Sequence, residues 1–386
     1  MDFEPSAEQK EVQALARDFA RAEIEPYAAD WDREHRFPRD LFTKLAELGL
    51  MGTCVPEEYG GAGTDFVSYI LTLEELSRAD AGVGVTVAVH TSAVTLPILH
   101  FGTEEQQSRF VPPLARGDYL GAFALTEPDA GSDAGSLKTR AEAEGDGWRI
   151  NGAKQWITNG RYAGTFLLFA RTDSGTLGAR GISAFILDAD HVRITRDEEK
   201  LGLNSSVTND IAVDTVVGRD RLIGELNHGF RIAMATLDGG RIGIAAQAVG
   251  IAQAALDVAS AYAKERNAFG RAIGGFGQVQ GKLADMQTEV EAARALTYRA
   301  ARLKEAGRPH TVEGAQAKLF ASAVARRQTG EAIQVLGGYG YTKEFPAERF
   351  YRDAKVTEIY EGTSEIQRLV IARSILGLKG REKVTA

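Results

Sequence analysis

The chain has 386 residues, which is enough for two or three domains rather than one. Hydrophobic residues make up 44% of it and charged residues 25%, the balance of an ordinary globular protein. Its net charge is −8, and no cluster of Lys and Arg interleaved with aromatic residues stands out, so we expect no nucleic-acid-binding surface. The single cysteine, Cys54, excludes an intrachain disulfide and fits a reducing compartment.

Several kinds of site and segment are not expected. None of the six histidines lies near another His, Cys or acid at ligand spacing, so we predict no metal site. The N-terminus, MDFEPSAEQK, is acidic and polar; it predicts no signal or transit peptide and hence a cytoplasmic protein. The most apolar long stretch, residues 242–259, is interrupted by Gln247, Gln253 and Asp257, which predicts a buried helix and no membrane insertion.

The first 120 residues have helical periodicity. Ser6 and Gln9 make a capping box before apolar residues that share one helix face, namely Val12, Leu15, Ala16 and Phe19. Further helical segments are expected at residues 41–48, 66–78 and 82–101.

From about residue 121 to 230 the pattern changes to short extended runs. Residues 166–170, 182–187 and 211–217 are β-branched and aromatic, and clusters of Gly, Asp and Asn separate them. We expect a β domain with antiparallel strands, because no helical crossover lies between them.

From about residue 231 the chain is helical again. Long helices are expected at residues 242–266, 283–306 and 311–336, and a short last one at 366–376. The alanine-rich first of these suits close helix packing in a bundle or at a subunit interface. The predicted architecture is α+β, mostly α.

Three common cofactor and nucleophile motifs are absent. The chain has no G-x-G-x-x-G after a strand, no Walker A sequence and no G-x-S-x-G. These absences weigh against an NAD-dependent dehydrogenase, an ATPase and an α/β-hydrolase.

Two segments of the predicted β domain could meet a flat polar ligand. Residues 125–133, LTEPDAGSD, could offer N–H groups and hydroxyls to a polar ring or a phosphate, or could form a self-bonded β-turn. In residues 154–159, KQWITN, Trp156 and Thr158 share one side of a strand. An aromatic beside a hydroxyl suits an isoalloxazine ring, although a core Trp with a satisfied Thr is the alternative.

Two helix ends carry residues typical of phosphate or nucleotide contacts. In residues 264–270, KERNAFG, Arg266 could clamp a pyrophosphate, or could instead complement the helix dipole. In residues 334–341, QVLGGYGY, glycines end a helix and allow a ligand to approach the backbone, but they also make an ordinary C-cap.

The last segment, residues 359–368 (IYEGTSEIQR), contains a candidate base. Glu361 stands just before a helix that Thr363 or Ser364 would cap, and Gly362 permits an unusual backbone path. Burial would raise the pKa of Glu361, and the helix N-terminus would lower it. Such opposition suits a base that is buried when idle and ionised when used, although a capping acid is the alternative.

Taken together and in this order, the five segments resemble the acyl-CoA dehydrogenase family over essentially the whole chain. Residues 237–247, LDGGRIGIAAQ, look most like its short-chain, butyryl-CoA branch. The resemblance implies an N-terminal helical domain (1–120), a middle antiparallel β domain (121–230) and a C-terminal four-helix bundle (231–386). It also implies a homotetramer with FAD as cofactor.

The resemblance also implies a set of site residues. Those that would line the flavin are Phe123, Leu125, Thr126, Trp156 and Thr158. Those that would bind the FAD pyrophosphate and adenosine across a subunit interface are Arg266, Phe269, Gln334, Gly337 and Gly338. Thr363 and Glu365 would also touch FAD. The CoA contacts would be Ser132, Asp238 and Arg241. Tyr360 and Gly362 would border the thioester, and Glu361 would be the catalytic base. The family usually has Gln where this chain has Gly277, which predicts a shift or loss of one FAD contact towards Gln278.

The implied reaction is α,β-dehydrogenation of a short- to medium-chain acyl-CoA to a trans-2-enoyl-CoA. Glu361 would take the α-proton, a hydride would pass to FAD N5, and an electron-transferring flavoprotein would accept the electrons. Three alternatives stay open: an acyl-CoA oxidase, which the short chain disfavours; enoyl-CoA reduction, including that of a dicarboxylic acyl-CoA; and a non-catalytic acyl-CoA-binding paralogue. The presence of Glu361 argues against the last.

Overall fold

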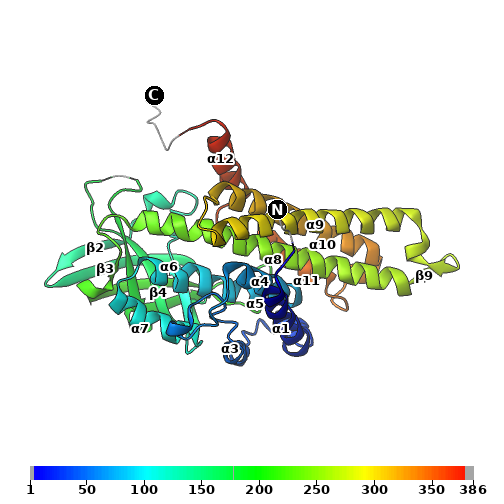
Figure 1. Cartoon of the computed structure of the whole chain (residues 1–386), viewed down its shortest axis with the longest axis horizontal. Helices are drawn as coiled ribbons and strands as arrows, with labels where there is room; N and C mark the ends of the chain where they lie inside the picture. The colour runs from blue at the N-terminus through cyan, green and yellow to red at the C-terminus, as the bar shows by residue number, and fades with distance from the viewer. Residues whose placement is uncertain (1–3, 177, 379–386) are drawn as a thin grey trace.

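The computed structural model describes residues 4–176 and 178–378, and helices enclose the sheet on one side of the chain's midpoint (Figure 1). An N-terminal helical block leads into a β-sheet, and a set of long helices follows. This order confirms the predicted α+β, mostly α, architecture.

Seven α-helices make up the described part of the N-terminal block. They are α1 (Ala7–Glu23), α2 (Ala28–Glu34), α3 (Arg39–Glu47), α4 (Phe66–Ala79), α5 (Ala81–Ala88), α6 (Leu96–Phe101) and α7 (Glu104–Ala115). The predicted capping box is present: the Ser6 hydroxyl accepts from the Gln9 N–H at 3.1 Å, and the Gln9 side chain accepts from the Ser6 N–H at 2.9 Å.

The helix expected over residues 82–101 is interrupted. A π-helical turn, Val89–Thr95, separates α5 from α6. Pro97 has no N–H to donate to the Ala93 carbonyl, so the regular hydrogen-bond ladder cannot continue through this point. The turn packs against β1 and brings buried polar residues to the middle of the molecule.

The sheet is mixed, which corrects the expectation of purely antiparallel strands. Its strands are β1 (Leu120–Ala124), β2 (Arg140–Glu144), β3 (Gly147–Thr158), β4 (Ala163–Arg171), β5 (Ile182–Asp188), β6 (Val192–Asp197), β7 (Thr208–Gly218) and β8 (Leu222–Ile223). They lie in the order β6-β7-β3-β2-β4-β5-β8, and β1 pairs with β4. The β1–β4 pair is parallel, as is the short β2–β4 contact. The β2–β3 hairpin serves as the long connection that a parallel pair requires, so no helix was needed between the strands.

A β-bulge in β3 decides where the predicted flavin residues point. The register with β7 shifts between Lys154 and Ile157, and Trp156 adopts a φ of +59°. As a result Lys154 and Ile157 are both buried, while Trp156 is 57% exposed. Bulges of this kind re-aim a side chain next to functional sites.

The C-terminal block consists of long helices. They are α8 (Gly229–Glu265), α9 (Gly277–Glu305), α10 (Thr311–Leu336), α11 (Ala347–Val356) and α12 (Ser364–Ile375). The ranges of α10 and α12 match the predictions closely, α8 and α9 start earlier than expected, and α11 was not predicted. The helices α8, α9 and α10 run side by side, while α12 projects from the bundle (Figure 1).

Two helical segments of the described chain are long and apolar enough to cross a membrane by length and composition alone. They are Ala81–Phe101 and Gly229–Glu265, and 89% and 83% of their most apolar windows are buried inside the protein. Burial of that extent is typical of core helices, so the prediction of a buried helix over residues 242–259 agrees with the packing of α8.

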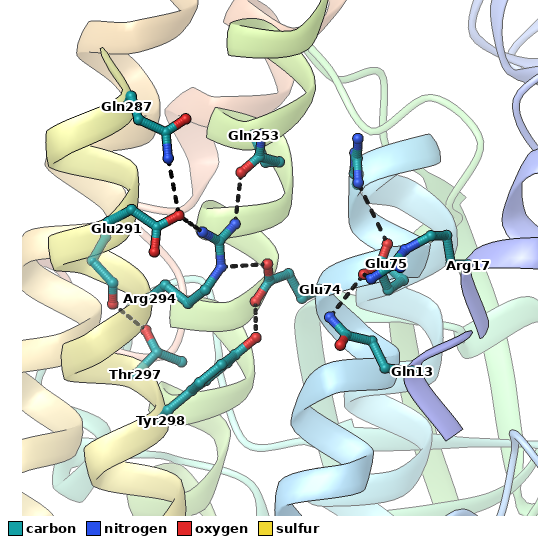
Figure 2. A network of polar contacts seen from close by, with 12 residues as sticks. Gln13, Arg17, Glu74, Glu75, Gln253, Gln287, Glu291, Arg294, Thr297 and Tyr298 are labelled. Carbon is teal, nitrogen blue, oxygen red and sulfur yellow. Dashed lines mark hydrogen bonds and ion pairs between the residues drawn. The ribbon is translucent and has the colours of Figure 1, made fainter. Parts of the chain in front are cut away.

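A buried polar network joins the two helical blocks (Figure 2). Glu74 of α4 accepts from the Arg294 guanidinium at 2.8 Å and from the Tyr298 hydroxyl at 2.7 Å, both from α9. Arg294 also donates to the Gln253 side chain of α8 at 2.7 Å. The neighbouring Glu75 receives Arg17 of α1 at 2.6 Å. Four helices therefore share one set of buried charges, and this set fixes α4 against the bundle that carries the candidate site.

Candidate active site

The backbone at Glu361 is held in an uncommon conformation between α11 and α12. Glu361 has a φ of +54° and Gly362 a φ of +91°, so two consecutive residues are in the left-handed half of the map. The Gln367 side chain donates to both of their carbonyls, at 3.2 and 2.8 Å. The Lys318 ammonium donates to the Gly362 carbonyl at 2.7 Å. These contacts hold a conformation that a carboxylate-bearing residue adopts at a cost.

The helix that follows begins as the sequence suggested. Thr363 is the N-cap of α12, and its hydroxyl accepts from the Ile366 N–H at 3.3 Å. Glu361 therefore stands two residues before the cap and is not itself the capping group, which removes the alternative of a capping acid.

The Glu361 carboxylate is shielded and unpaired. The residue is half-buried, but its Oε2 atom is inaccessible to solvent and has no hydrogen-bond partner in the described part of the chain. The carboxylate lies against α8 at Gly240, where a Cβ atom would come within 2.6 Å of Oε2. Burial raises the pKa of Glu361 to about 7, opposed by Arg241 and then by Lys318. A carboxylate with free lone pairs and a pKa near neutrality can take up a proton.

Tyr360, the neighbour of the candidate base, is fixed through α8. Its hydroxyl is hydrogen-bonded to the Gln247 side-chain oxygen, and the Gln247 amide donates to the Ala81 carbonyl at 2.7 Å. The start of α5 and the middle of α8 therefore both lie next to the loop that carries Glu361. Gln247 was noted in the sequence only as an interruption of an apolar stretch; a lone amide in such a stretch was the available signal.

Two of the residues predicted to contact CoA form an ion pair beside the base. Arg241 donates to Asp238 at 2.6 Å, and Asp238 also accepts from the Thr311 hydroxyl at 2.6 Å. Arg241 is only 5% exposed, and its Nε atom has no partner among the described residues. The third, Ser132, is exposed on the loop after β1. The structure thus brings Asp238 and Arg241 to Glu361, while Ser132 lies on a different element.

The two segments predicted to line the flavin lie side by side. The Thr126 carbonyl accepts from the Gln155 N–H at 2.9 Å, and Lys154 donates to the Leu125 carbonyl at 3.1 Å. Leu125 is buried, while Thr126 is half-buried.

The other three flavin-lining candidates belong to the same part of the sheet. Phe123 of β1 is half-buried and packs on Phe169, with ring centroids 5.1 Å apart. Thr158 is half-buried and Trp156 is mostly exposed, so the alternative of a core tryptophan is wrong.

A buried ion pair that the sequence analysis missed anchors the 125–133 loop. Lys154 is fully buried and lies 2.8 Å from the Glu127 carboxylate. Glu127 also accepts from the Lys138 N–H at 2.6 Å and the Thr139 N–H at 2.9 Å. The alternative of a merely self-bonded turn is therefore incomplete, because the loop is tied to β3 through its own acid.

The residues predicted to hold pyrophosphate and adenosine gather at the far end of the bundle. Arg266 caps α8, and its guanidinium lies 5.8 Å from the Tyr339 ring centroid, next to the glycines that follow α10. Phe269 is 96% exposed, and a Cβ at Gly337 or Gly338 would meet nothing within 4 Å. Gln334 lies in the last turn of α10.

This second group is remote from the candidate base within one chain. Arg266 follows Arg241 by 25 residues along α8, which spans about 37 Å at the rise of an α-helix. One chain therefore does not unite the two groups. Gly277 and Gln278 are both exposed at the start of α9, and which of them replaces the expected FAD contact stays a prediction.

Thr363 and Glu365 face a different opening. They line a hollow of about 840 Å³ between α9, α10 and α12. Glu365 is exposed, and the first of the interactions that lower its pKa is with a backbone N–H at the start of α12.

One histidine does lie beside acids, which corrects the sequence expectation. Ligand atoms of Asp188, Asp190 and His191 lie within 4.8 Å of one another. The His191 Nδ1 atom accepts from the Asp188 N–H at 3.2 Å, and Asp188 binds Arg221 at 2.6 Å. These atoms already have partners, so the cluster is a local cap, and it carries no argument for a metal.

Comparisons with known proteins agree with this geometry. The N-terminal, middle and C-terminal domain models of the acyl-CoA dehydrogenases match residues 6–118, 122–216 and 227–376. The short-chain specific acyl-CoA dehydrogenase of Clostridium acetobutylicum is 49% identical over 378 residues, which cover 97% of this chain and 100% of the relative.

Solved structures share the fold over nearly the whole chain. Butyryl-CoA dehydrogenase from Megasphaera elsdenii has a TM-score of 0.96 at 44% identity, covering 97% of this chain and 100% of that chain. A chain in the structure of the electron transferring flavoprotein of Acidaminococcus fermentans has a TM-score of 0.96 at 47% identity, with the same coverage. A glutaryl-CoA dehydrogenase from Mycobacterium smegmatis, 31% identical with a TM-score of 0.92 over 98% of this chain and 97% of that chain, is described with FADH2. Acyl-CoA dehydrogenases are FAD-dependent. Sequence and fold together show that this chain belongs to the acyl-CoA dehydrogenase family.

Proposed function

We propose that the protein dehydrogenates short-chain acyl-CoA thioesters between the α and β carbons, with Glu361 as the base that removes the α-proton. The observation that carries this proposal is the shielded, unpaired Oε2 atom of Glu361. It belongs to a residue in a left-handed conformation that three donated hydrogen bonds support. A carboxylate held in this way is prepared to accept a proton and has no other partner to satisfy.

The same loop supports a role in polarising the thioester. The Glu361 N–H makes no hydrogen bond to any described residue. A free backbone N–H next to the base could donate to the thioester carbonyl oxygen, where negative charge develops as the α-proton leaves. Donors of this kind are worth about 3 kcal/mol in the transition state when aimed at the developing charge.

The residues present fit an FAD cofactor. Trp156 offers an exposed aromatic face beside Thr158, with Thr126 on the adjoining loop. At the other end of the bundle, Arg266 offers a guanidinium, and Gly337 and Gly338 leave the backbone uncovered. When bound, FAD would supply the hydride acceptor for the β-carbon. In this proposal the protein binds, orients and polarises, and Glu361 moves the proton.

The assembly and partners are part of the proposal. The FAD-binding residues at the remote end of the bundle, about 37 Å from Arg241 along α8, are best explained if a second copy completes each cofactor site. We therefore propose a homotetramer of the kind that the family resemblance implies. The likeness to a chain in an electron transferring flavoprotein structure supports an electron-transferring flavoprotein as the electron acceptor. A cytoplasmic location remains part of the same proposal.

Substrate length and direction can be tested together. The purified protein, loaded with FAD, is mixed anaerobically with butyryl-, octanoyl-, palmitoyl- and glutaryl-CoA, and the absorbance of oxidised flavin is followed. Rapid loss with butyryl-CoA, and none with Glu361→Gln, supports the proposal. Oxidised flavin that persists with every thioester, while crotonyl-CoA reoxidises chemically reduced protein, would favour enoyl-CoA reduction.

A further inference from the structure

Lys318 is a buried cation without an ion-pair partner. It lies on α10 with a fully buried side chain, and no carboxylate of the described residues lies within ion-pairing distance of it. Burying an ammonium in this way is unfavourable unless something nearby uses it. Its ammonium makes one hydrogen bond, to the Gly362 carbonyl at 2.7 Å. The charge is therefore directed at the peptide that follows the candidate base.

That peptide is gripped by two different donors. The Gly362 carbonyl accepts from Lys318 and from the neutral Gln367 amide, which lies at 2.8 Å and also reaches the Glu361 carbonyl at 3.2 Å. Both donors oppose relaxation of the two left-handed residues towards ordinary conformations. Only Lys318 adds a positive charge, so geometry and charge come from separable side chains.

We propose that Lys318 is a positioning residue for Glu361: it fixes the backbone of the base through the Gly362 carbonyl, and its charge favours the ionised carboxylate that accepts the proton. The proposal rests on Glu361 being the base. Lys318 needs no contact with substrate or cofactor, because its hydrogen bond ends on the protein backbone.

Electrostatics around the two groups agrees with this arrangement. Burial lowers the pKa of Lys318 to about 8, opposed first by Glu361; Arg241 of α8 lowers it further, while Glu358 and Glu365 raise it. Burial raises the pKa of Glu361 to about 7, opposed by Arg241 and then by Lys318. Each group thus favours the charged form of the other.

Arg241 is the other cation near Glu361, but its charge is already shared. It is paired with Asp238 at 2.6 Å, whereas Lys318 has no paired acid. Removal of Lys318 would leave Glu361 facing one cation that is partly neutralised. The ionised carboxylate would then be less favourable, and the pH at which the base becomes active would rise.

A matched pair of variants separates the two effects. Lys318→Met removes one donor and the charge, and Gln367→Met removes a donor to the same carbonyl without changing charge. Both should lower kcat for butyryl-CoA. Only Lys318→Met should move the acidic limb of the kcat/KM profile to higher pH, by about one unit, which corresponds to roughly tenfold lower activity below the limb. An equal midpoint in wild type and Lys318→Met, or the same shift in both variants, would overturn the proposal.

A direct titration keeps the outcome independent of turnover. The protonated-carboxyl band of Glu361, obtained by infrared difference spectroscopy against Glu361→Gln, should persist to higher pH in Lys318→Met and not in Gln367→Met. If Lys318→Met does not fold, Lys318→Gln provides the same comparison, since it also removes the charge. A wild-type protein that no thioester reduces would refute the proposed function, while the infrared titration would still decide whether Lys318 and Glu361 are coupled.

Discussion

Gly240 of α8 and the Glu361 carboxylate are in direct contact, because a Cβ at position 240 would come within 2.6 Å of Oε2 and 2.9 Å of the carboxyl carbon. A glycine in the middle of a helix is otherwise unfavourable by about 0.5–1 kcal/mol relative to alanine. At this position it provides the space that the base occupies. The contact thus connects a backbone choice in α8 to the chemistry of a loop more than a hundred residues later.

Gly240→Ala should therefore lower activity without lowering stability. The new methyl group would displace the carboxylate, and misplacement of a catalytic group by about 1 Å can cost roughly 10²-fold in rate. Gly239→Ala is the matched control, since a Cβ there would meet the Lys304 side chain at an ordinary 3.4 Å. Steady-state kinetics and thermal unfolding of both variants are the measurements. Equal kcat values in the two variants would contradict the contact.

Glu361→Gln should abolish turnover while the protein still binds FAD and acyl-CoA. A general base contributes about 10²–10⁴-fold, and the amide cannot accept the proton. Flavin content and the change in flavin spectrum on adding butyryl-CoA measure binding, and anaerobic reduction measures the chemistry. Flavin reduction at a wild-type rate would exclude Glu361 as the base.

The pH dependence has a defined sign. Since burial raises the pKa of Glu361 to about 7, kcat/KM should rise with pH and level off above an apparent pKa near 7.

Stability should change in the opposite direction. The carboxyl pKa is raised above its ordinary value of 4.5, so the folded state holds the proton more tightly than the unfolded state between these two values. The stability that this proton provides is present below pH 4.5 and is lost as the pH rises through 7. Melting temperatures of wild type and Glu361→Gln, compared from pH 5 to 8, should diverge, with the variant relatively more stable at pH 8. Parallel curves would mean that Glu361 is not buried in its protonated form.

The buried network in Figure 2 predicts a large effect of Arg294→Met on folding. That change would leave Glu74, which is only 3% exposed, without its cation, and removing one partner of a buried pair costs about 3–5 kcal/mol. The double variant Glu74→Leu, Arg294→Met should recover a substantial part of the loss. Denaturant unfolding of the two single variants and the double variant gives the coupling free energy, and simple additivity would argue against a shared buried pair.

Arg266→Ala should weaken FAD retention. A guanidinium at the end of α8, next to the uncovered backbone of Gly337 and Gly338, suits a bidentate phosphate contact. The flavin-to-protein absorbance ratio after dialysis measures the effect. Lys264→Ala is the control, because it removes an exposed cation from the last turn of the same helix. Equal flavin loss in both variants would favour the alternative that Arg266 only complements the helix dipole.

Much of this protein is determined by its sequence alone. Periodicities of 3.6 and 2 identify the helical and β blocks, and cap residues such as Ser6 and Thr363 define helix starts, because these signals act between neighbours in the chain. The motif around Glu361 also indicates the candidate base before any contact is known. Only the tertiary structure decided the parallel β1–β4 pairing, the bulge that exposes Trp156, and the meeting of Gly240, Lys318 and Gln247 with the Glu361 loop. These features depend on side chains and strands brought together across 40 or more residues, and local preferences carry no information about such long-range packing.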